Sequence, residues 1–445
     1  MSGRPAPSVR HPVARALART DPWVVPVLVL LATAAYCWIY GAGLARTPIR
    51  SDGAGYYIYL PAIVVFGDPT LQSLAHDCCG GRAPAHGLSR WPETGRWLNQ
   101  YPIGVALLAA PAYVAAHALT LWSGMPPDGF SFLYAHAAGL CGVAAFGIGL
   151  ALVRRILAQS FAPPVAAATL LVVGLGTNLI HYAAWDPFYS HVYSFALIAA
   201  LLYVSPLWLD APSVRRSLLL GTLAGLIVLV RHPNALFLLL VPLFGIERPG
   251  DLAGRARVLA RRGRHAAIAG GAALVVVAPQ LLLYRTSTGH WVVSAYRDQW
   301  FDFAHPELAG VLFGVTKGLF FWSPVLLLVV PGVFAMRGAV GAWRTPVAVV
   351  LAAHTYLVAS WWDWQFGSSY GHRAFTDAIG LMALPMAAAL ESIGRHRGAA
   401  VFAGVALGAA LALSLAQMIQ VWTGVMPMDD VTWEQYTRLF LRFER

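Results

Sequence analysis

The segment 23–44, WVVPVLVLLATAAYCWIYGAGL, decides the fold class because it carries no charged side chain over a length that can cross a bilayer. A spanning helix needs about 20 apolar residues. Only 11% of the 445 residues are charged, whereas soluble domains carry about 25%. This composition excludes a soluble enzyme, a disordered scaffold and a barrel of alternating strands, and it predicts an all-α polytopic membrane protein. Further apolar blocks cover residues 101–122, 130–152, 163–183, 190–209, 218–245, 266–284, 319–336, 346–362, 376–393 and 399–420.

The N-terminal segment 1–22 resembles the basic start of a signal peptide. The apolar segment that follows it is too long for a signal peptide and has no convincing cleavage site. We therefore expect it to be retained as the first span, with residues 1–22 in the cytoplasm. The basic residues of this segment are Arg4, Arg10, Arg15 and Arg19.

Two of the apolar blocks are ambiguous as spans. Block 101–122 contains two prolines, and block 218–245 is interrupted by Arg231 and a proline. As a single helix, 218–245 would hold Arg231 near the bilayer centre at a cost of about 2.5–3.5 kcal/mol. The positive-inside rule is best satisfied when 101–122 lies along the outer interface and 218–245 forms two short spans that meet at Arg231.

This arrangement predicts about eleven transmembrane helices plus outer juxtamembrane helices in a cell membrane, either an inner or a plasma membrane. The N-terminus is expected in the cytoplasm and the C-terminus outside. Polar side chains then gather on the periplasmic or extracellular face, where we expect the active site. The expected parts are the cytoplasmic segment 1–22, a transmembrane domain at 23–420 with a first outer loop at 45–129, and a short outer tail at 421–445.

The net charge of +11 does not indicate a nucleic-acid partner, because the 31 basic residues lie between apolar blocks and not on one face. Membrane orientation accounts for them, and membrane lipids are expected partners. The four cysteines do not form a disulfide framework. Cys37 and Cys141 lie in apolar segments and are expected to be packing residues. The adjacent Cys78 and Cys79 can bridge each other or bind a metal, and the sequence leaves both alternatives open.

Two carboxylates in the predicted outer loops are candidates for catalysis. Asp52 begins the stretch DGAGYYIYLP at 52–61, whose tyrosines, with Tyr56 and Tyr57 first, suit a segment lying flat on the interface. A carboxylate held there is either a solvated cap or a general base. Asp186 lies in WDPFYSH at 185–191, where it either caps the next helix beside Pro187 or acts in the site.

Three cations share the predicted outer face with these carboxylates. Arg231, Lys317 and Arg373 lie at helix ends, where snorkelling to lipid headgroups is the simpler explanation. Together they can also hold a phosphate, which arginine binds bidentately and lysine binds as a point charge. Histidines such as His191 and His372 form no metal-binding motif. No cofactor is predicted, and a divalent metal remains an alternative that we do not favour.

The motifs SDG at 51–53 with YY at 56–57, WDP at 185–187 with SH at 190–191, and GHR at 371–373 resemble the GT-C glycosyltransferases, which use polyprenyl-phosphate sugars. The bacterial branch related to protein O-mannosyltransferases and aminoarabinose transferases is the most similar. The resemblance implies that Asp52 is the base, that Asp186 is the second acid of the outer cavity, and that Arg373, Arg231 and Lys317 hold the phosphate.

Tyr56, Tyr57, His191 and His372 are the other expected substrate-binding residues. The chain departs from the protein mannosyltransferases in two respects. Its first loop has a single Asp52 where they carry an acidic pair, and it has no large outer C-terminal domain. The expected reaction is therefore transfer of a sugar from a polyprenyl-phosphate donor to a lipid or glycan acceptor, with inversion.

A multi-span transporter or flippase of lipid-linked or sugar substrates is the alternative. It would need an inverted repeat and discontinuous helices near the midplane. Only the break at Arg231 has that character in the sequence, and no internal repeat is evident. A non-catalytic scaffold is disfavoured by the two acidic loops and the three cations that share one predicted face.

Overall fold

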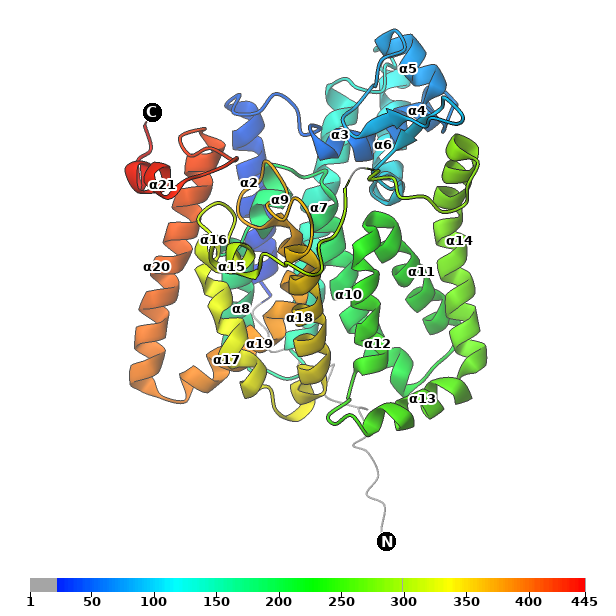
Figure 1. The fold of residues 1–445 in the computed structure, drawn as a ribbon. Coiled ribbons are helices and arrows are strands. Elements are labelled where there is room, and N and C mark those ends of the chain that lie inside the picture. Colours follow the sequence, from blue (N-terminus) through cyan, green and yellow to red (C-terminus); the bar gives the residue numbers. More distant parts are fainter. Residues whose placement is uncertain (1–21, 298, 445) are drawn as a thin grey trace.

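Helices dominate the computed structural model, which describes residues 22–297 and 299–444 (Figure 1). Within the described chain, seven segments are long and apolar enough to cross a membrane, or eight if a pair of helices bent by 103° counts as one span. The protein is therefore an all-α polytopic membrane protein. The seven segments are α2 (Val24–Gly41), α6 (Gly104–Trp122), α7 (Phe132–Leu157), α10 (Ser190–Asp210), α14 (Gly263–Thr288), η4 with α19 (Arg373–Ala378 and Ile379–Gly394) and α20 (Arg397–Trp422).

The predicted count of about eleven spans is not confirmed, because several apolar blocks form short or broken helices. Block 163–183, for example, divides into α8 (Pro163–Leu175) and α9 (Leu179–Ala184). A helix of 13 residues is about 20 Å long and falls short of a hydrocarbon core of about 30 Å. The other short elements are α11 (Val214–Val230), η1 (His232–Leu239), α12 (Leu240–Leu243), α13 (Asp251–Arg261), α15 (Leu308–Phe313), α16 (Leu319–Trp322), η2 (Pro324–Leu328), α17 (Val329–Ala335), η3 (Gly338–Trp343), α18 (Arg344–Ala359) and α21 (Trp433–Leu439).

The predicted break at Arg231 is confirmed. Helix α11 ends at Val230, Arg231 is extended with φ −157° and ψ 112°, and η1 begins with a proline in its first turn. Proline lacks an amide N–H and disfavours the helical conformation of the preceding residue, so the chain cannot continue the α-helix here. The break leaves the Arg231 side chain at a helix end.

Helix α10 lies at the centre of the bundle. Of its most apolar 18-residue stretch, 72% of the residues are buried, whereas only 6% are buried in the corresponding stretches of α14 and α20. Two glycines permit close packing between elements of the bundle. A Cβ at Gly142 of α7 would lie 2.1 Å from the carbonyl oxygen of Pro187, and a Cβ at Gly221 of α11 would lie 2.0 Å from that of Ala269 in α14. Small residues let helix backbones approach in this way in membrane proteins.

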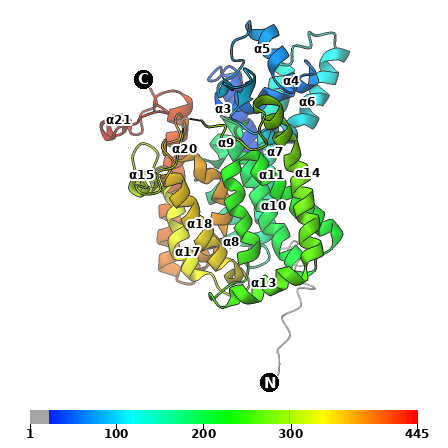
Figure 2. The same ribbon diagram turned by 45° about the vertical axis from the view of Figure 1, so that its right-hand side comes forward.

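The first predicted outer loop folds into a small structure at one end of the bundle, while the arginine-rich α13 lies at the opposite end (Figures 1 and 2). This separation fits the positive-inside prediction, and the side that each end faces remains a prediction. The loop contains α3 (Asp52–Tyr57), α4 (Tyr59–Val64), α5 (Gln72–Cys79) and an antiparallel pair of strands, β1 (Leu88–Arg90) and β2 (Trp97–Asn99).

Helix α6 was expected to lie along the interface, yet it is long and apolar enough to span. It packs mainly against α7 and also against α3, α4 and α11, and Gly129 beyond its C-terminus accepts hydrogen bonds from Tyr57 of α3 (2.6 Å) and Tyr113 of α6 (3.1 Å). These contacts return the chain to α3 directly after α6. The interfacial position of 101–122 therefore remains a prediction.

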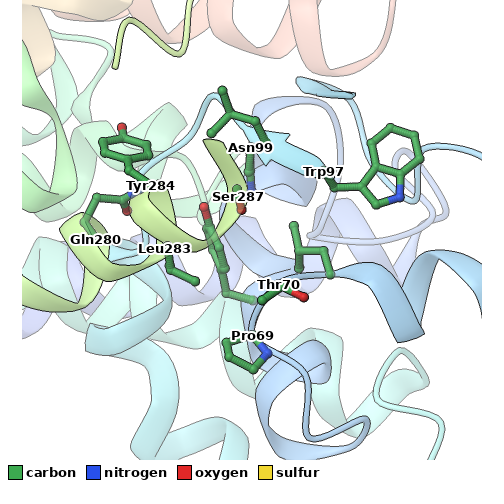
Figure 3. A pocket seen from close by; sticks show the side chains of 11 residues that line it. Pro69, Thr70, Trp97, Asn99, Gln280, Leu283, Tyr284 and Ser287 are labelled. Atoms are coloured by element: carbon green, nitrogen blue, oxygen red, sulfur yellow. The ribbon is translucent and has the colours of Figure 1, made fainter. Parts of the chain in front are cut away.

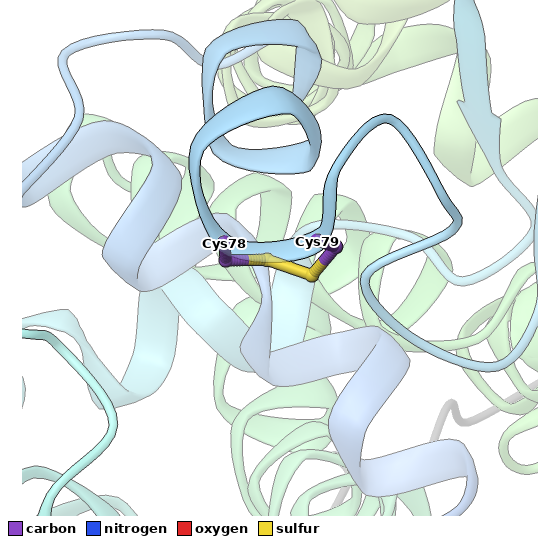
Figure 4. The surroundings of a disulfide bond; sticks show 2 residues. All are labelled: Cys78 and Cys79. Carbon is purple, nitrogen blue, oxygen red and sulfur yellow. A yellow bond between two sulfur atoms is a disulfide. The ribbon is translucent and has the colours of Figure 1, made fainter.

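Cys78 and Cys79 form a disulfide at the C-terminal end of α5 (Figure 4). This selects the first of the two alternatives that the sequence left open. Cys141 is half-buried, whereas Cys37 is exposed on α2, so the prediction of a packing role is wrong for Cys37.

Candidate functional site

Asp52, the first residue of α3, lies in an ion pair with Arg373. Its Oδ2 is 3.0 Å from Nη1 of Arg373, and its Oδ1 accepts a hydrogen bond of 2.8 Å from the Tyr101 hydroxyl. Burial and the adjacent Asp52 charge raise the pKa of Tyr101, so this phenol stays protonated and donates. The Asp52 side chain is still 18% exposed. A small ligand can therefore reach this carboxylate.

The DGAG sequence explains how Tyr101 reaches Asp52. A Cβ at Gly55 would lie 2.0 Å from the Tyr101 ring, so only glycine leaves room for that ring beside α3. Asn99 donates a hydrogen bond of 2.7 Å to the Gly55 carbonyl and fixes the strand end against the helix. At Gly53 a Cβ would make only ordinary contacts of 3.5–3.6 Å. Gly55 is thus required by the site, whereas Gly53 is not.

Arg231 and Arg373, which are 142 positions apart in the sequence, meet at the ring of Phe366. The guanidinium carbons lie 5.3 Å and 5.9 Å from its centroid, and Arg373 also lies 5.6 Å from the centroid of Tyr189. Phe366 has a φ of 57°, which is uncommon for a residue with a side chain. The strained loop between α18 and η4 therefore places one aromatic ring in contact with two cations.

Asp377 in η4 is a site residue that the sequence interpretation missed. It is fully buried, with one oxygen 2.8 Å from Nδ1 of His191 and the other 2.9 Å from Nη1 of Arg231. Asp377 lies one turn after Arg373 at the start of an apolar block. A carboxylate in such a block is rare and usually functional, and that signal was available in the sequence.

Asp186 has a different environment from that of Asp52. Arg50 binds one of its oxygens (Nε 3.0 Å, Nη2 2.9 Å), and Nε2 of His181 lies 3.2 Å from the other. Nδ1 of His181 accepts a hydrogen bond of 2.9 Å from the Trp422 indole, so its proton is on Nε2 and is directed at Asp186. The Asp186 side chain is only 5% exposed.

This network affects the charge of Asp186. Burial alone would raise its pKa, but the adjacent Arg50 charge and the His181 hydrogen bond outweigh burial and lower it below the usual value. The carboxylate is therefore ionised and fully occupied. In this geometry it joins the segment before α3 to the α9–α10 turn and to the end of α20.

Tyr56 and Tyr57 are buried and their hydroxyls are occupied. Tyr56 donates to Ser190 Oγ (3.1 Å) and Tyr57 to the Gly129 carbonyl (2.6 Å). Their rings pack against Tyr101 and Phe188, among others. The expectation of a tyrosine-rich segment lying flat on the interface is wrong for these residues, because the rings are packed inside the protein.

Lys317 is bound by two backbone carbonyls, and it lies within electrostatic range of Arg373. It is 2% exposed, and its ammonium donates to the carbonyls of Ser369 (2.6 Å) and Met428. Burial lowers its pKa to about 8. In the described structure Lys317 therefore ties the loop before η4 to the segment after α20. His372 is also buried, with its ring edge-on to Phe366 and Phe375.

The segment between α14 and α15 lies next to this site. Trp362 donates a backbone hydrogen bond of 3.1 Å to the Trp300 carbonyl, and the rings of Tyr296 and Trp361 are 6.0 Å apart. Burial and the nearby Asp52 charge raise the pKa of Tyr296 to about 12. Tyr101 and Tyr296 are therefore further site residues, and no signal in the sequence distinguished them from the other tyrosines.

A small open hollow lies between the end of α14 and the β2 region (Figure 3). Its lining includes Asn99 and Tyr284, and none of the residues predicted for the site. Among residues 22–297 and 299–444, no three His, Cys, Asp or Glu side chains form a group that can hold a metal ion. The candidate site is therefore the cluster of Asp52, Arg373, Arg231, Asp377, His191, Tyr101, Tyr296 and Phe366.

Comparison of the chain with family models, curated proteins and solved structures finds no match. The resemblance to GT-C glycosyltransferases depends on the short motifs alone and remains a prediction. Any function must therefore be argued from the chemistry of the cluster.

Proposed function

We propose that this protein is a glycosyltransferase that moves a sugar from a polyprenyl-phosphate donor to a lipid or glycan acceptor at the membrane. Asp52 is the base, and Arg373 and Arg231 hold the donor phosphate. The end of the bundle that carries α3 is the periplasmic or extracellular side of a cell membrane.

One observation carries the proposal: a reachable carboxylate lies 3.0 Å from one of two arginines that share an aromatic ring. Arginine binds phosphate oxygens bidentately, and two such side chains at one ring suit a phosphodiester. The apolar surroundings suit a donor with a prenyl chain. Displacement of a phosphate from a sugar carbon needs a base for the attacking hydroxyl and cations for the leaving phosphate. A carboxylate beside two arginines can supply both.

The reaction is a single displacement. Asp52 takes the proton from the acceptor hydroxyl as its oxygen bonds to the anomeric carbon. The bond from that carbon to the phosphate oxygen breaks, and polyprenyl phosphate leaves with the electron pair as a stable anion. The configuration at the anomeric carbon inverts. The leaving group needs no protonation, which agrees with a site that contains one reachable carboxylate.

Asp52→Asn tests the base. We expect turnover to fall by about 10²–10⁴-fold, because the amide cannot accept the proton. Purified protein is incubated with a panel of polyprenyl-phosphate sugars and membrane-lipid acceptors, and products are read by mass spectrometry. The size-exclusion profile and melting temperature of the variant should match those of the wild type.

The donor panel also tests the class of enzyme. Consumption of at least one donor by the wild type, with a new glycosidic product, is expected. A variant Asp52→Asn that retains turnover contradicts the assignment of the base. A wild type that consumes no member of the panel contradicts the donor class.

A transporter or flippase is the second candidate, because the structure contains interrupted helices. The α11–η1 break at Arg231 and the 103° bend between Pro324–Ala335 and Gly338–Ala359 resemble the discontinuous helices of transporters. Movement of a fluorescent prenyl-phosphate lipid across proteoliposomes, without a covalent product, would favour this function. Covalent transfer without such movement would favour the transferase.

A further inference from the structure

The two arginines of the site have partners of different accessibility. Asp377, the partner of Arg231, is fully buried, and His191 holds its second oxygen. Asp52, the partner of Arg373, is 18% exposed and has the Tyr101 hydroxyl as its other contact. A carboxylate that is fully buried cannot lose its cation without a large desolvation cost, whereas a partly exposed one can be solvated. The first pair is therefore fixed and the second exchangeable.

Arg373 has hydrogen-bonding capacity that Asp52 does not use. Asp52 contacts Nη1, whereas the Nε of Arg373 is buried and makes no hydrogen bond. A buried donor without an acceptor is costly, and a ligand that supplies one relieves that cost. Phosphate offers adjacent oxygens that match Nε and an Nη of one guanidinium. Phosphate therefore suits Arg373 better than the present single contact does.

We propose that the donor phosphate replaces Asp52 as the partner of Arg373. Donor binding then frees the Asp52 carboxylate oxygen, which takes the proton from the hydroxyl of the acceptor substrate. This inference rests on the proposed function. Arg231 remains paired with Asp377 and binds the phosphate from a fixed position. Asp377 is therefore the positioning residue for Arg231. The cluster contains two cations and two carboxylates, so an arriving phosphate must compete with a carboxylate. Asp52 is the one that can be displaced.

The exchange predicts opposite effects from the same substitution at the two carboxylates. Asp52→Asn removes the competitor, so farnesyl phosphate should bind about three- to tenfold more tightly than to the wild type. Asp377→Asn releases Arg231 from its position, so the same probe should bind at least about tenfold more weakly. Binding is measured by calorimetry in detergent with the full chain, and farnesol serves as the uncharged probe.

Two controls separate exchange from simpler effects. Asp363→Asn removes one negative charge from the loop that carries Phe366 without belonging to either ion pair, and it should change affinity by less than about twofold. Asp52→Ser repeats the main test if the asparagine variant does not fold. Farnesol affinity should be the same in all variants.

Each outcome has one meaning. Tighter binding to Asp52→Asn with weaker binding to Asp377→Asn supports the exchange. Unchanged or weaker binding to Asp52→Asn, or an equal gain in Asp363→Asn, overturns the exchange and leaves the proposed function standing. Failure of the wild type to bind farnesyl phosphate in preference to farnesol overturns both the exchange and the proposed function.

Discussion

At the scale of single residues, the surroundings of each carboxylate decide what it can do. Asp186 is enclosed by Arg50 and by a histidine whose proton is directed at it, and little of its surface is exposed. Asp52 has one cation, one phenol and an opening. Both are predicted as outer acids of one cavity, and the Asp52 side chain is the more exposed of the two. Asp186 is better suited to holding three segments together.

Asp186→Asn should lower stability. The new amide has only one acceptor oxygen, so its NH2 would face either the N–H of His181 or the guanidinium of Arg50, and His181 cannot change tautomer because Trp422 donates to its other nitrogen. Breaking a buried charge network of this kind costs about 3–5 kcal/mol. We expect the melting temperature in detergent to fall by several degrees. An unchanged melting temperature would contradict the structural role.

The same residue predicts a pH dependence. Its pKa is lower in the folded state than the ordinary value of 3.8, so its stabilising contribution is complete above that value and is lost as the pH falls through the lower folded value. The wild-type melting temperature should therefore drop below about pH 4, and Asp186→Asn should show a smaller drop. Parallel curves for the two proteins would argue against this origin of acid sensitivity.

At the scale of elements, α3 and the end of β2 form a unit that depends on one glycine. Gly55 lies where a side chain would overlap Tyr101, whereas Gly53 lies in ordinary contact distance of Tyr189. Both are glycines in a six-residue helix, so the substitution has the same effect on helix propensity at the two positions. The pair therefore isolates the effect of the Tyr101 contact.

Gly55→Ala should displace Tyr101 from Asp52, whereas Gly53→Ala should be tolerated. We expect Gly55→Ala to reduce sugar transfer by about tenfold or more and to lower the melting temperature, because overpacking costs about 1–3 kcal/mol. Turnover and thermal melting of both variants are compared with those of Tyr101→Phe, which loses only the hydroxyl. Equal behaviour of the two alanine variants would show that Tyr101 does not need this space.

At the scale of the whole molecule, the candidate site lies at the end of the bundle opposite the arginine-rich α13 (Figures 1 and 2). The positive-inside rule then predicts that α13 is cytoplasmic and that the α3 end is outside. The contacts of Gly129 with Tyr57 and Tyr113 indicate that the chain that follows α6 returns toward the end of the bundle that carries α3. Both statements concern sidedness and can be tested together.

Single cysteines placed in a Cys37- and Cys141-free background report this sidedness. Glu93→Cys in the first outer loop and Met125→Cys just after α6 should react with a membrane-impermeant maleimide in intact cells. Ala253→Cys in α13 should react only after permeabilisation. If Met125→Cys, like Ala253→Cys, reacts only after permeabilisation, α6 spans the membrane.

The sequence by itself determined the membrane class, the helical fold, the break at Arg231 and the importance of Asp52 as a candidate, because hydropathy, proline and isolated charge act locally along the chain. Tertiary structure decided which charges meet. In the folded protein Asp52 pairs with Arg373, and Asp186 pairs with Arg50. Lys317 is buried and binds backbone carbonyls. The site also contains Asp377, Tyr101 and Tyr296. Ion pairing depends on distances between segments far apart in the chain. In a mostly apolar protein an unpaired buried charge is strongly destabilising, so its partner is the opposite charge that tertiary packing brings within reach.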